Sequence, residues 1–260
     1  MLPPAAPEEI YTMSLRSVAD ACAVALGLTL ICLTPSTARA VELLAENFDD
    51  VATLPGAGWV ETNNSSPLGE TGWFQGNSGI FPAQAGAANA YIGANFLNAG
   101  AGGNISNWLM LPELLLDPTI ALSFYTRTEE LSFFPDRLEV RLSTSGGSSD
   151  VGATDASVGD FTTLLLTINP TLDFDSYPTE WTQFTVNLNG VLGGPISGRL
   201  AFRYFVTNTD ENGNYIGIDT VRVATVPEPG TAGLLALGML GCLLARRRIC
   251  VLACAVDRRR

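Results

Sequence analysis

Four carboxylates lie close together in one part of the chain, at Glu129, Glu130, Asp136 and Glu139. Most glycosidases use a protonated and an ionised carboxyl group that flank the scissile bond, so such a pair could hydrolyse a glycan. The surrounding sequence favours another interpretation. Glu129 and Glu130 stand directly before LSFFPD, which predicts a loop, and Glu139 falls on the polar side of an alternating segment. We therefore expect solvated charges here, with an acid-pair glycan hydrolase as the alternative.

Two adjacent aromatic residues, Trp73 and Phe74, form a second candidate site in or near a predicted loop. Rings exposed on a sandwich domain can stack against sugars, and buried rings can equally fill its core, because each removes a large apolar area from water. We expect the core role for Trp59, Trp108 and Trp181. Trp73 and Phe74 are the candidate ligand-binding residues of a carbohydrate-binding module, and burial in the core is the alternative.

The composition removes several other classes of function. The 260 residues carry a formal charge of −12, and none of them is His. Without imidazole there is no histidine base, nucleophile activator or zinc ligand. The acidic balance also excludes a broad electrostatic grip on nucleic acid, which needs clustered cations against the phosphates. We expect neither a nucleic-acid partner nor an enzyme.

The candidate residues depend on β-strands for their positions. Leu138, Val140 and Leu142 alternate with polar residues, which predicts a half-buried strand. The same alternation, or a short apolar run, marks five further segments, 120–127, 161–168, 181–190, 199–208 and 215–226. The run at 161–168 is continuously apolar and predicts a central strand. In the last segment the alternation shifts near Asp219, which predicts a bulge.

Turn-rich tracts separate these strands, in keeping with 26 Gly and 15 Pro. Residues 143–160 hold few large apolar side chains and predict a long mobile loop, 98–104 predicts another loop, and 209–214 predicts a hairpin turn. Antiparallel strands with loops this long predict an all-β fold, a jelly-roll-like antiparallel β-sandwich, as one domain over residues 41–225.

Residues 1–40 have the pattern of a secretory signal peptide with a signal helix. Arg16 precedes an apolar run, and Ala38 and Ala40 fit an A-x-A cleavage site. The first twelve residues contain two glutamates that suit a signal poorly, so we expect Met13 to be the true start. No twin arginine occurs within residues 1–40, which favours export by the Sec machinery. All five cysteines lie in the first or last forty residues, so the body has no disulfide framework.

The segment VPEPGTAGLLALGMLGCLLARRR, residues 226–248, joins three chemically different parts. A Pro-Glu-Pro triplet breaks helix and strand. The uncharged Thr231–Ala245 follows, about 22 Å long as a helix and short against a bilayer core of roughly 30 Å. It predicts a C-terminal transmembrane helix that holds the chain transiently in the inner membrane, with the arginines on the cytoplasmic side. The motif residues are Val226, Pro227, Glu228, Pro229, Arg246, Arg247 and Arg248.

This order resembles the PEP-CTERM protein-sorting signal. The resemblance implies recognition by an exosortase, cleavage near the Pro-Glu-Pro triplet, and delivery to the cell surface or extracellular matrix. Such signals normally end soon after the arginines, whereas residues 249–260 form an atypical C-terminal extension. Two explanations stay open: a frameshift or mispredicted stop, and a real segment whose cysteines meet the membrane.

Four segments of the body follow one another in a recognisable order: ENFDDVATLPGAGW, AYIGANFLNAGAGGNISNWLMLPEL, DRLEVRLS and YIGIDTVRV. In this order the body resembles the choice-of-anchor J domain, a family of bacterial surface domains related to the cleaved-adhesin and MAM-type jelly rolls. The four segments span nearly the whole body. The resemblance implies a β-sandwich and an exported protein, and it implies no defined reaction.

The same resemblance implies a structural calcium ion between the first and last strands. The candidate ligands are Glu46, Asp49 or Asp50, and Asp219. Calcium takes six to eight oxygens, so two or three carboxylates with backbone carbonyls would suffice. The alternative is that Asp49 and Asp50 form a solvated turn and Asp219 is a bulge residue.

Together these patterns predict an exported, non-catalytic β-sandwich of a biofilm-forming bacterium, sorted to the envelope surface or the matrix. We expect a structural or adhesive role. The alternative is a carbohydrate-binding module that acts on exopolysaccharide.

Overall fold

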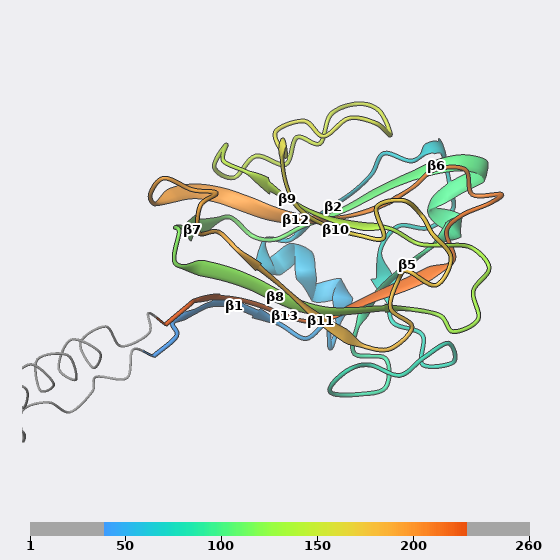
Figure 1. Cartoon of the computed structure of the whole chain (residues 1–260), viewed down its shortest axis with the longest axis horizontal. Coiled ribbons are helices and arrows are strands. Elements are labelled where there is room, and N and C mark those ends of the chain that lie inside the picture. The colour runs from blue at the N-terminus through green and yellow to red at the C-terminus, as the bar shows by residue number, and fades with distance from the viewer. Residues whose placement is uncertain (1–38, 228–260) are drawn as a thin grey trace, which may run out of the picture. The chain divides into compact units, whose positions relative to one another are not determined.

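The alternation of apolar and polar residues produces the strands. In β9 (Leu138–Ser143) every second residue, beginning with Leu138, is buried in the core between two sheets. The neighbouring β12 (Ile196–Val206) pairs with it antiparallel and adds Phe202 to the same core. The computed structural model describes residues 39–227, and it forms two antiparallel sheets that face each other (Figure 1). The all-β sandwich predicted from the sequence is confirmed.

One sheet has six strands in the order β11-β8-β13-β5-β4, with β1 also paired to β13. The bounds of these strands are β1 (Glu42–Glu46), β4 (Phe74–Gln75), β5 (Ile92–Asn95), β8 (Ile120–Thr128), β11 (Thr182–Asn187) and β13 (Tyr215–Thr225).

The other sheet has seven strands in the order β10-β9-β12-β6-β2, with β3 paired to β6 and β7 paired to β12. Besides β9 and β12, its members are β2 (Val60–Asn63), β3 (Ser66–Leu68), β6 (Ala99–Met110), β7 (Leu114–Leu116) and β10 (Thr163–Ile168). Two short 3-10 helices, η1 (Val51–Ala57) and η2 (Phe96–Asn98), lie in the connections between strands.

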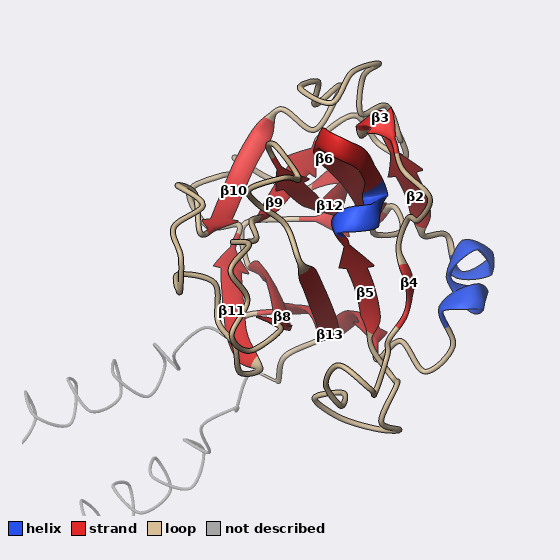
Figure 2. Cartoon of the chain, turned by 90° about the vertical axis from the view of Figure 1, so that its right-hand side faces the viewer, coloured by secondary structure: helices blue, strands red, loops and turns tan. Residues whose placement is uncertain are grey.

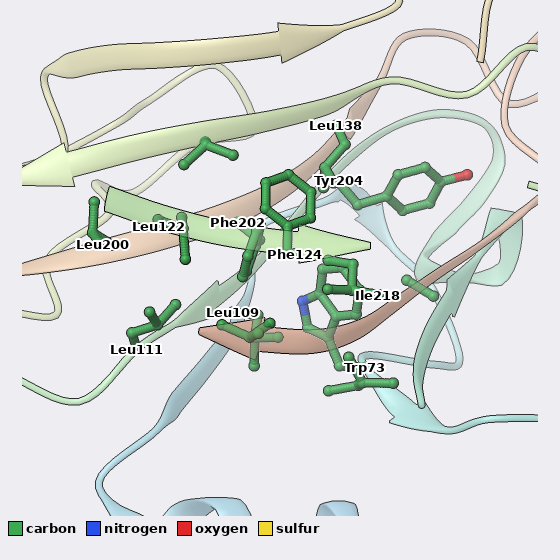
Figure 3. Close-up of a cluster of buried hydrophobic side chains, with 14 of the residues drawn as sticks. Trp73, Leu109, Leu111, Leu122, Phe124, Leu138, Leu200, Phe202, Tyr204 and Ile218 are labelled. Atoms are coloured by element: carbon green, nitrogen blue, oxygen red, sulfur yellow. The ribbon is translucent and has the colours of Figure 1, made fainter. Parts of the chain in front are cut away.

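Both sheets contribute large side chains to one core between them. Phe124 of β8 meets Phe202 of β12 with ring centroids 4.8 Å apart, which joins the two sheets at the centre. Leu109, Leu138 and Ile218 surround this contact, as Figure 3 shows. Burial of these apolar side chains is what holds the two sheets face to face.

Segment 144–162, which links β9 to β10, packs on the outer face of the second sheet. It was predicted to be a mobile loop because it contains few large apolar side chains. Two of these, Val151 and Phe161, are nevertheless buried against Trp108 and Met110 of β6. The segment lies at the top of Figure 1. Two well-placed side chains are thus enough to anchor it.

Two predictions about strand arrangement are wrong. The apolar run at 161–168 forms β10, which lies at the edge of its sheet instead of the centre. The segment 209–214 does not close a hairpin, because β12 and β13 belong to different sheets and the chain crosses between them. Both errors concern which strands become neighbours, a property that local patterns do not encode.

The predicted bulge near Asp219 is confirmed. The register of β13 against β8 shifts between Asp219 and Arg222. Thr220 has a φ of 51°, a left-handed conformation that is rare for a β-branched residue. The bulge leaves Asp219 fully buried.

The two ends of the sandwich differ. At one end β1 begins and β13 finishes, where the backbone N–H of Thr225 donates to the carbonyl of Val41. At the other end three loops, β8–β9, β10–β11 and β12–β13, cross from one sheet to the other (Figures 1 and 2). β13 runs from the second end to the first, a span of roughly 30 Å at about 3.3 Å per residue.

The predicted signal peptide, transmembrane helix, arginine cluster and C-terminal extension lie outside the described residues. Within residues 39–227, no helix is long and apolar enough to cross a membrane.

Candidate functional site: a cleft between two crossing loops

Two loops border a cleft at the end of the sandwich opposite Val41. Loop 129–137 links β8 to β9, and loop 169–181 links β10 to β11, so both cross from one sheet to the other. The cleft is small and partly open to solvent. We call it the loop-end cleft, and it is lined by Thr128, Glu129, Ser132, Phe134, Pro135, Asp136, Asp173, Asp175, Tyr177 and Thr179.

Exposed apolar side chains from both loops surround the loop-end cleft. Leu131 is 88% exposed, Phe133 78%, Phe174 52% and Phe134 43%. The rings of Phe133 and Phe174 stack on one another across the two loops, with centroids 5.9 Å apart and an interplanar angle of 22°. Single exposed apolar residues are ordinary, whereas a group of them marks a surface used for contact.

Four carboxylates line the same cleft, and three of them, Glu129, Asp173 and Asp175, lie nearer the surface than Asp136. Glu129 accepts a hydrogen bond from Asn214 Nδ2 at 2.9 Å, and Asp173 accepts one from Thr171 Oγ1 at 2.5 Å. Each of these groups keeps further lone pairs available, because a carboxylate has about four acceptor positions. Asp175 is exposed to solvent. The cleft therefore combines apolar rings with hydrogen-bond acceptors of negative charge.

Asp136 forms the buried floor of the loop-end cleft, with 1% of its surface exposed. Its Oδ1 accepts from Tyr204 Oη at 2.6 Å and from the backbone N–H of Asn214 at 2.8 Å. Its backbone carbonyl accepts from Asn169 Nδ2 at 2.9 Å. One residue thus ties together the two bordering loops and the β12–β13 crossing.

The hydrogen bonds around Asp136 are complete when its carboxyl group carries a proton. Thr128 Oγ1 lies 2.5 Å from Asp136 Oδ2 and 3.0 Å from the carbonyl of Tyr215, and a hydroxyl has a single proton to donate. If Thr128 donates its proton to the carbonyl of Tyr215, the short contact between Thr128 Oγ1 and Asp136 Oδ2 is a hydrogen bond only when the carboxyl group of Asp136 is protonated and donates. Burial raises the pKa of Asp136, against the lowering effect of hydrogen bonds from Thr128, Tyr204 and Asn214.

The two bordering loops also concentrate unusual backbone conformations. Leu131 (φ 58°), Asn169 (φ 54°), Leu172 (φ 54°) and Asp175 (φ 60°) all lie in the left-handed region. Asn and Asp adopt it readily, but leucine rarely does. Such conformations persist where surrounding contacts impose them, and they concentrate at ligand sites.

The structure separates the four carboxylates that suggested hydrolysis. Glu129 and Asp136 line the loop-end cleft, whereas Glu130 is exposed and pairs with Arg127 at 3.7 Å. Glu139 points away from the core, as its alternation predicted, but it is not solvated. Its Oε2 lies 2.7 Å from Arg141 Nε and 3.3 Å from Arg203 Nη1, beneath segment 144–162.

Arg203 completes this buried network. Its Nε donates to Ser106 Oγ at 3.0 Å, its Nη2 donates to the carbonyl of Asp155, and its guanidinium lies 3.7 Å from the ring centre of Phe205. Burial lowers the pKa of Arg203 to about 10, so the guanidinium stays charged near neutrality. Glu139 therefore fixes the covering segment through Arg203 and is unavailable to a ligand.

The carboxylates proposed for calcium have identifiable partners. Glu46 Oε1 accepts from the backbone N–H of Phe48 at 2.7 Å, and Asp50 Oδ1 accepts from that of Ala52 at 3.0 Å as the N-cap of η1. Asp219 Oδ2 accepts from Gln84 N at 2.9 Å, and burial raises its pKa.

Asp49 lies against the same segment as Asp219. A Cβ atom on Gly86 would sit 3.4 Å from Asp49 Oδ1. Within residues 39–227, no three Asp, Glu, His or Cys side chains converge on one point. An ion between Asp49 and Asp219 would therefore need backbone carbonyls for its remaining ligands, and calcium stays a prediction.

Trp73 lies in the core and is 6% exposed, so its ring is not part of the surface (Figure 3). Phe74 is half-buried and packs with Tyr215, with centroids 5.7 Å apart. The sequence left two roles open for Trp73 and Phe74, ligand binding and burial in the core, and the position of Trp73 matches the second. The expected burial of Trp59 and Trp108 is confirmed, and Trp181 is half-buried.

At the other end of the sandwich, the chain leaves β13 and enters the segment that begins at Val226. The backbone N–H of Val226 still donates to the carbonyl of Thr119, at 2.6 Å, and this bond is the last that ties the segment to the sandwich among the described residues. Residues 225–248 match the PEP-CTERM protein-sorting motif. The matched motif therefore starts at Thr225, the final residue of β13, one residue before the start at Val226 that the sequence predicted. It indicates export and sorting to the cell surface.

Solved structures with a similar fold include two cleaved adhesin domains of Lys-gingipain. The K1 domain from Porphyromonas gingivalis W83 is 21% identical, with 71% of this chain and 97% of that chain covered and a TM-score of 0.46. The K2 domain is 19% identical, with 71% and 99% covered and a TM-score of 0.47. The CBM22-1 xylan-binding domain of Paenibacillus barcinonensis Xyn10C is 14% identical, with 73% and 97% covered and a TM-score of 0.39. No curated protein matches the chain.

Proposed function

We propose that the chain is an exported, exosortase-sorted protein of the cell surface or extracellular matrix, with an adhesive role exerted through the loop-end cleft. The observation that carries this proposal is the position of the PEP-CTERM motif, which follows directly on the last strand of the sandwich. The motif accounts for delivery, and the sandwich is the part that is delivered.

The two ends of the sandwich support an adhesive role. The chain enters at Val41 and leaves at Val226, where Val41 N also donates to Thr225 Oγ1 at 2.8 Å. The exposed rings of Phe133 and Phe174 lie at the other end. A domain that is tethered at one end and carries its apolar surface at the other presents that surface to its surroundings.

Export itself is part of the proposal. We infer that the Sec machinery exports the chain and that the signal peptide is cleaved after Ala40. The apolar segment of the PEP-CTERM motif then holds the chain briefly in the inner membrane, and an exosortase cleaves near Pro227.

The proposal assigns no reaction to the cleft. Of the four carboxylates that could have formed a catalytic pair, Asp136 is buried beneath the surface and Glu139 is held by two arginines. Glu129 alone of the four reaches the open part of the cleft. Turnover of a polysaccharide that disappears on Glu129→Gln would overturn the non-catalytic assignment.

A carbohydrate-binding module is the second candidate, and the loop-end cleft favours it. The cleft offers rings for stacking and the acceptors of Glu129, Asp173 and Asp175 for sugar hydroxyls. This candidate and the adhesive role are compatible, because a surface protein adheres to a matrix by binding its polysaccharide.

The delivery proposal is tested by the intact mass of the mature protein from its native host, combined with protease shaving of whole cells. We expect an N-terminus at Val41, a C-terminus near the Pro-Glu-Pro triplet, and release of the body by protease. An intact tail on a protein that is inaccessible from outside would contradict the proposal.

A further inference from the structure

We propose that the loop-end cleft binds a polysaccharide that carries ammonium groups, such as a partly deacetylated amino-sugar polymer. This inference rests on the proposed function and names the ligand class of the same site. The inference depends on two features that occur together on one small surface, exposed aromatic rings and carboxylates without a cationic partner within residues 39–227.

The rings supply the first half of the site. Phe133 and Phe174 come from different loops, stack on one another and remain largely exposed. Phe134 reaches from the rim into the lining of the cleft. The C–H face of a sugar ring can lie flat on such a surface, and a cation within about 6 Å of a ring face is attracted by its quadrupole.

Carboxylates supply the second half. Glu129, Asp173 and Asp175 line the cleft, and Glu130 lies 66% exposed beside them. Arg127 pairs with Glu130 at 3.7 Å, but no arginine of the described residues forms an ion pair with Glu129, Asp173 or Asp175. Arg137 donates to the carbonyls of Phe205 and Pro170 and lies over the Phe205 ring, and neither it nor Arg127 lines the cleft. The open part of the cleft therefore carries excess negative charge next to the faces of aromatic rings.

Charge decides between possible occupants. A uronic-acid polysaccharide would meet like charge at Asp173 and Asp175. A second copy of the chain would do so too, because the chain has a formal charge of −12. The hydroxyl groups of Ser132 and Thr179 also line the cleft and suit a ligand rich in hydroxyls. An amino-sugar polymer satisfies the rings, the hydroxyls and the carboxylates together.

The test compares three oligosaccharides of equal length on the exported protein purified from its host. The probes are a glucosamine hexamer, an N-acetylglucosamine hexamer and a hexamer of galacturonic acid, measured by isothermal titration calorimetry. We expect the glucosamine hexamer to bind about tenfold more tightly than its N-acetylated counterpart, and the galacturonate not to bind. Added salt should reduce this preference, because exposed charges are screened.

Variants separate the two halves of the site. The double variant Asp173→Asn with Asp175→Asn should lose the preference for glucosamine while it retains binding to the N-acetylated hexamer. The double variant Phe133→Ala with Phe174→Ala should weaken binding of both by about tenfold. Leu115→Ala and Asp150→Asn alter an exposed apolar side chain and an exposed carboxylate elsewhere, and both should bind like the natural protein. Unchanged thermal midpoints establish that the variants are folded.

Three outcomes would overturn the proposal. Equal affinity for the two amino-sugar hexamers would show that the cleft does not recognise ammonium groups, although it would still bind polysaccharide. Absence of binding to all three removes polysaccharide binding at the cleft. Concentration-dependent self-association that is lost on Phe133→Ala assigns the rings to a second copy. None of these outcomes bears on delivery to the cell surface, which the intact-mass measurement and the protease shaving of whole cells test separately.

Discussion

Thr128 Oγ1 lies 2.5 Å from Asp136 Oδ2 and 3.0 Å from the carbonyl of Tyr215. The hydroxyl can donate to only one of them. A neutral Asp136 resolves this, because the acid donates to Thr128, Thr128 donates to the carbonyl, and Asp136 Oδ1 accepts from Tyr204 and Asn214. We infer that Asp136, at the floor of the loop-end cleft, carries a proton and serves as donor and acceptor at once.

Replacement of Asp136 tests this protonation state. An asparagine amide also donates on one side and accepts on the other. Below about pH 4 the acid is protonated in the folded and the unfolded chain, so there Asp136→Asn should change the free energy of unfolding by less than about 1 kcal/mol. Asp136→Ala leaves Thr128, Tyr204 and the Asn214 N–H without their partner and should destabilise by about 3 kcal/mol. Urea denaturation at about pH 3 measures both. A strongly destabilised Asn variant would show that the ionised form is the native one.

The pH dependence of stability provides a second test. Because burial raises the pKa of Asp136 in the folded chain, the unfolded chain releases this proton first as the pH rises. The contribution of Asp136 is therefore complete below its ordinary pKa of about 4 and is lost as the pH rises through the folded value. Relative to Asp136→Asn, the natural protein should lose stability over that interval. Parallel curves for the two proteins would contradict the raised pKa.

The buried pair of Glu139 and Arg203 yields a third prediction. Glu139→Ala leaves the charge of Arg203 buried without its partner and should destabilise the fold by about 3–5 kcal/mol. The matched control is Glu130→Ala, because that carboxylate is 66% exposed and its ion pair contributes less than about 1 kcal/mol. Denaturant unfolding compares the two. Similar small effects would mean that segment 144–162 does not depend on the network.

Trp73 should behave as a core residue. Trp73→Ala removes a side chain packed between the sheets and should destabilise by about 3–5 kcal/mol. Trp73→Phe should be milder, because the indole N–H has no hydrogen-bond partner within residues 39–227 and none is lost. Thermal melts measure both effects, with the exposed Phe174→Ala as the control. If Trp73→Phe melts like the natural protein but no longer binds glycan, Trp73 is a ligand-binding residue and this prediction is wrong.

Calcium is testable by chelation. If the ion lies between Asp49 and Asp219, EDTA should lower the thermal midpoint by several degrees, because a ligand of the folded state stabilises it. Asp219→Asn should abolish the effect of EDTA, and the exposed Asp210→Asn should retain it. An unchanged midpoint on chelation removes the calcium site.

Local patterns predicted the six strands from β8 to β13, the bulge at Asp219 and the outward direction of Glu139. They missed the strands before β8, and residues 98–104, predicted as a loop, include the start of β6. They could not predict what covers Glu139, because the covering segment returns from farther along the chain. The edge position of β10 escaped prediction for a related reason. A continuous apolar run is typical of a strand that is buried on both faces, yet Leu164 in β10 is 49% exposed.

The sequence indicated one of the two loops that border the loop-end cleft. The segment LSFFPD was expected to be a loop, and three large apolar residues in a loop are an unusual composition. Its partner, loop 169–181, shares no pattern with it. Only the crossing of both loops at one end of the sandwich brings Phe133 onto Phe174, and such a pairing depends on strand order.

The course of β13 has a mechanical consequence. It begins at Tyr215, beside the floor of the loop-end cleft, and ends one residue before Val226, with β8 on one side and β5 and β1 on the other. A pull between a ligand in the cleft and the C-terminal end of the sandwich at Val226 would run along this strand and load its lateral hydrogen bonds together, in shear. A pull between Val41 and Val226 would open β1 from β13 one bond at a time. We expect the sandwich to withstand far more force in the first direction than in the second.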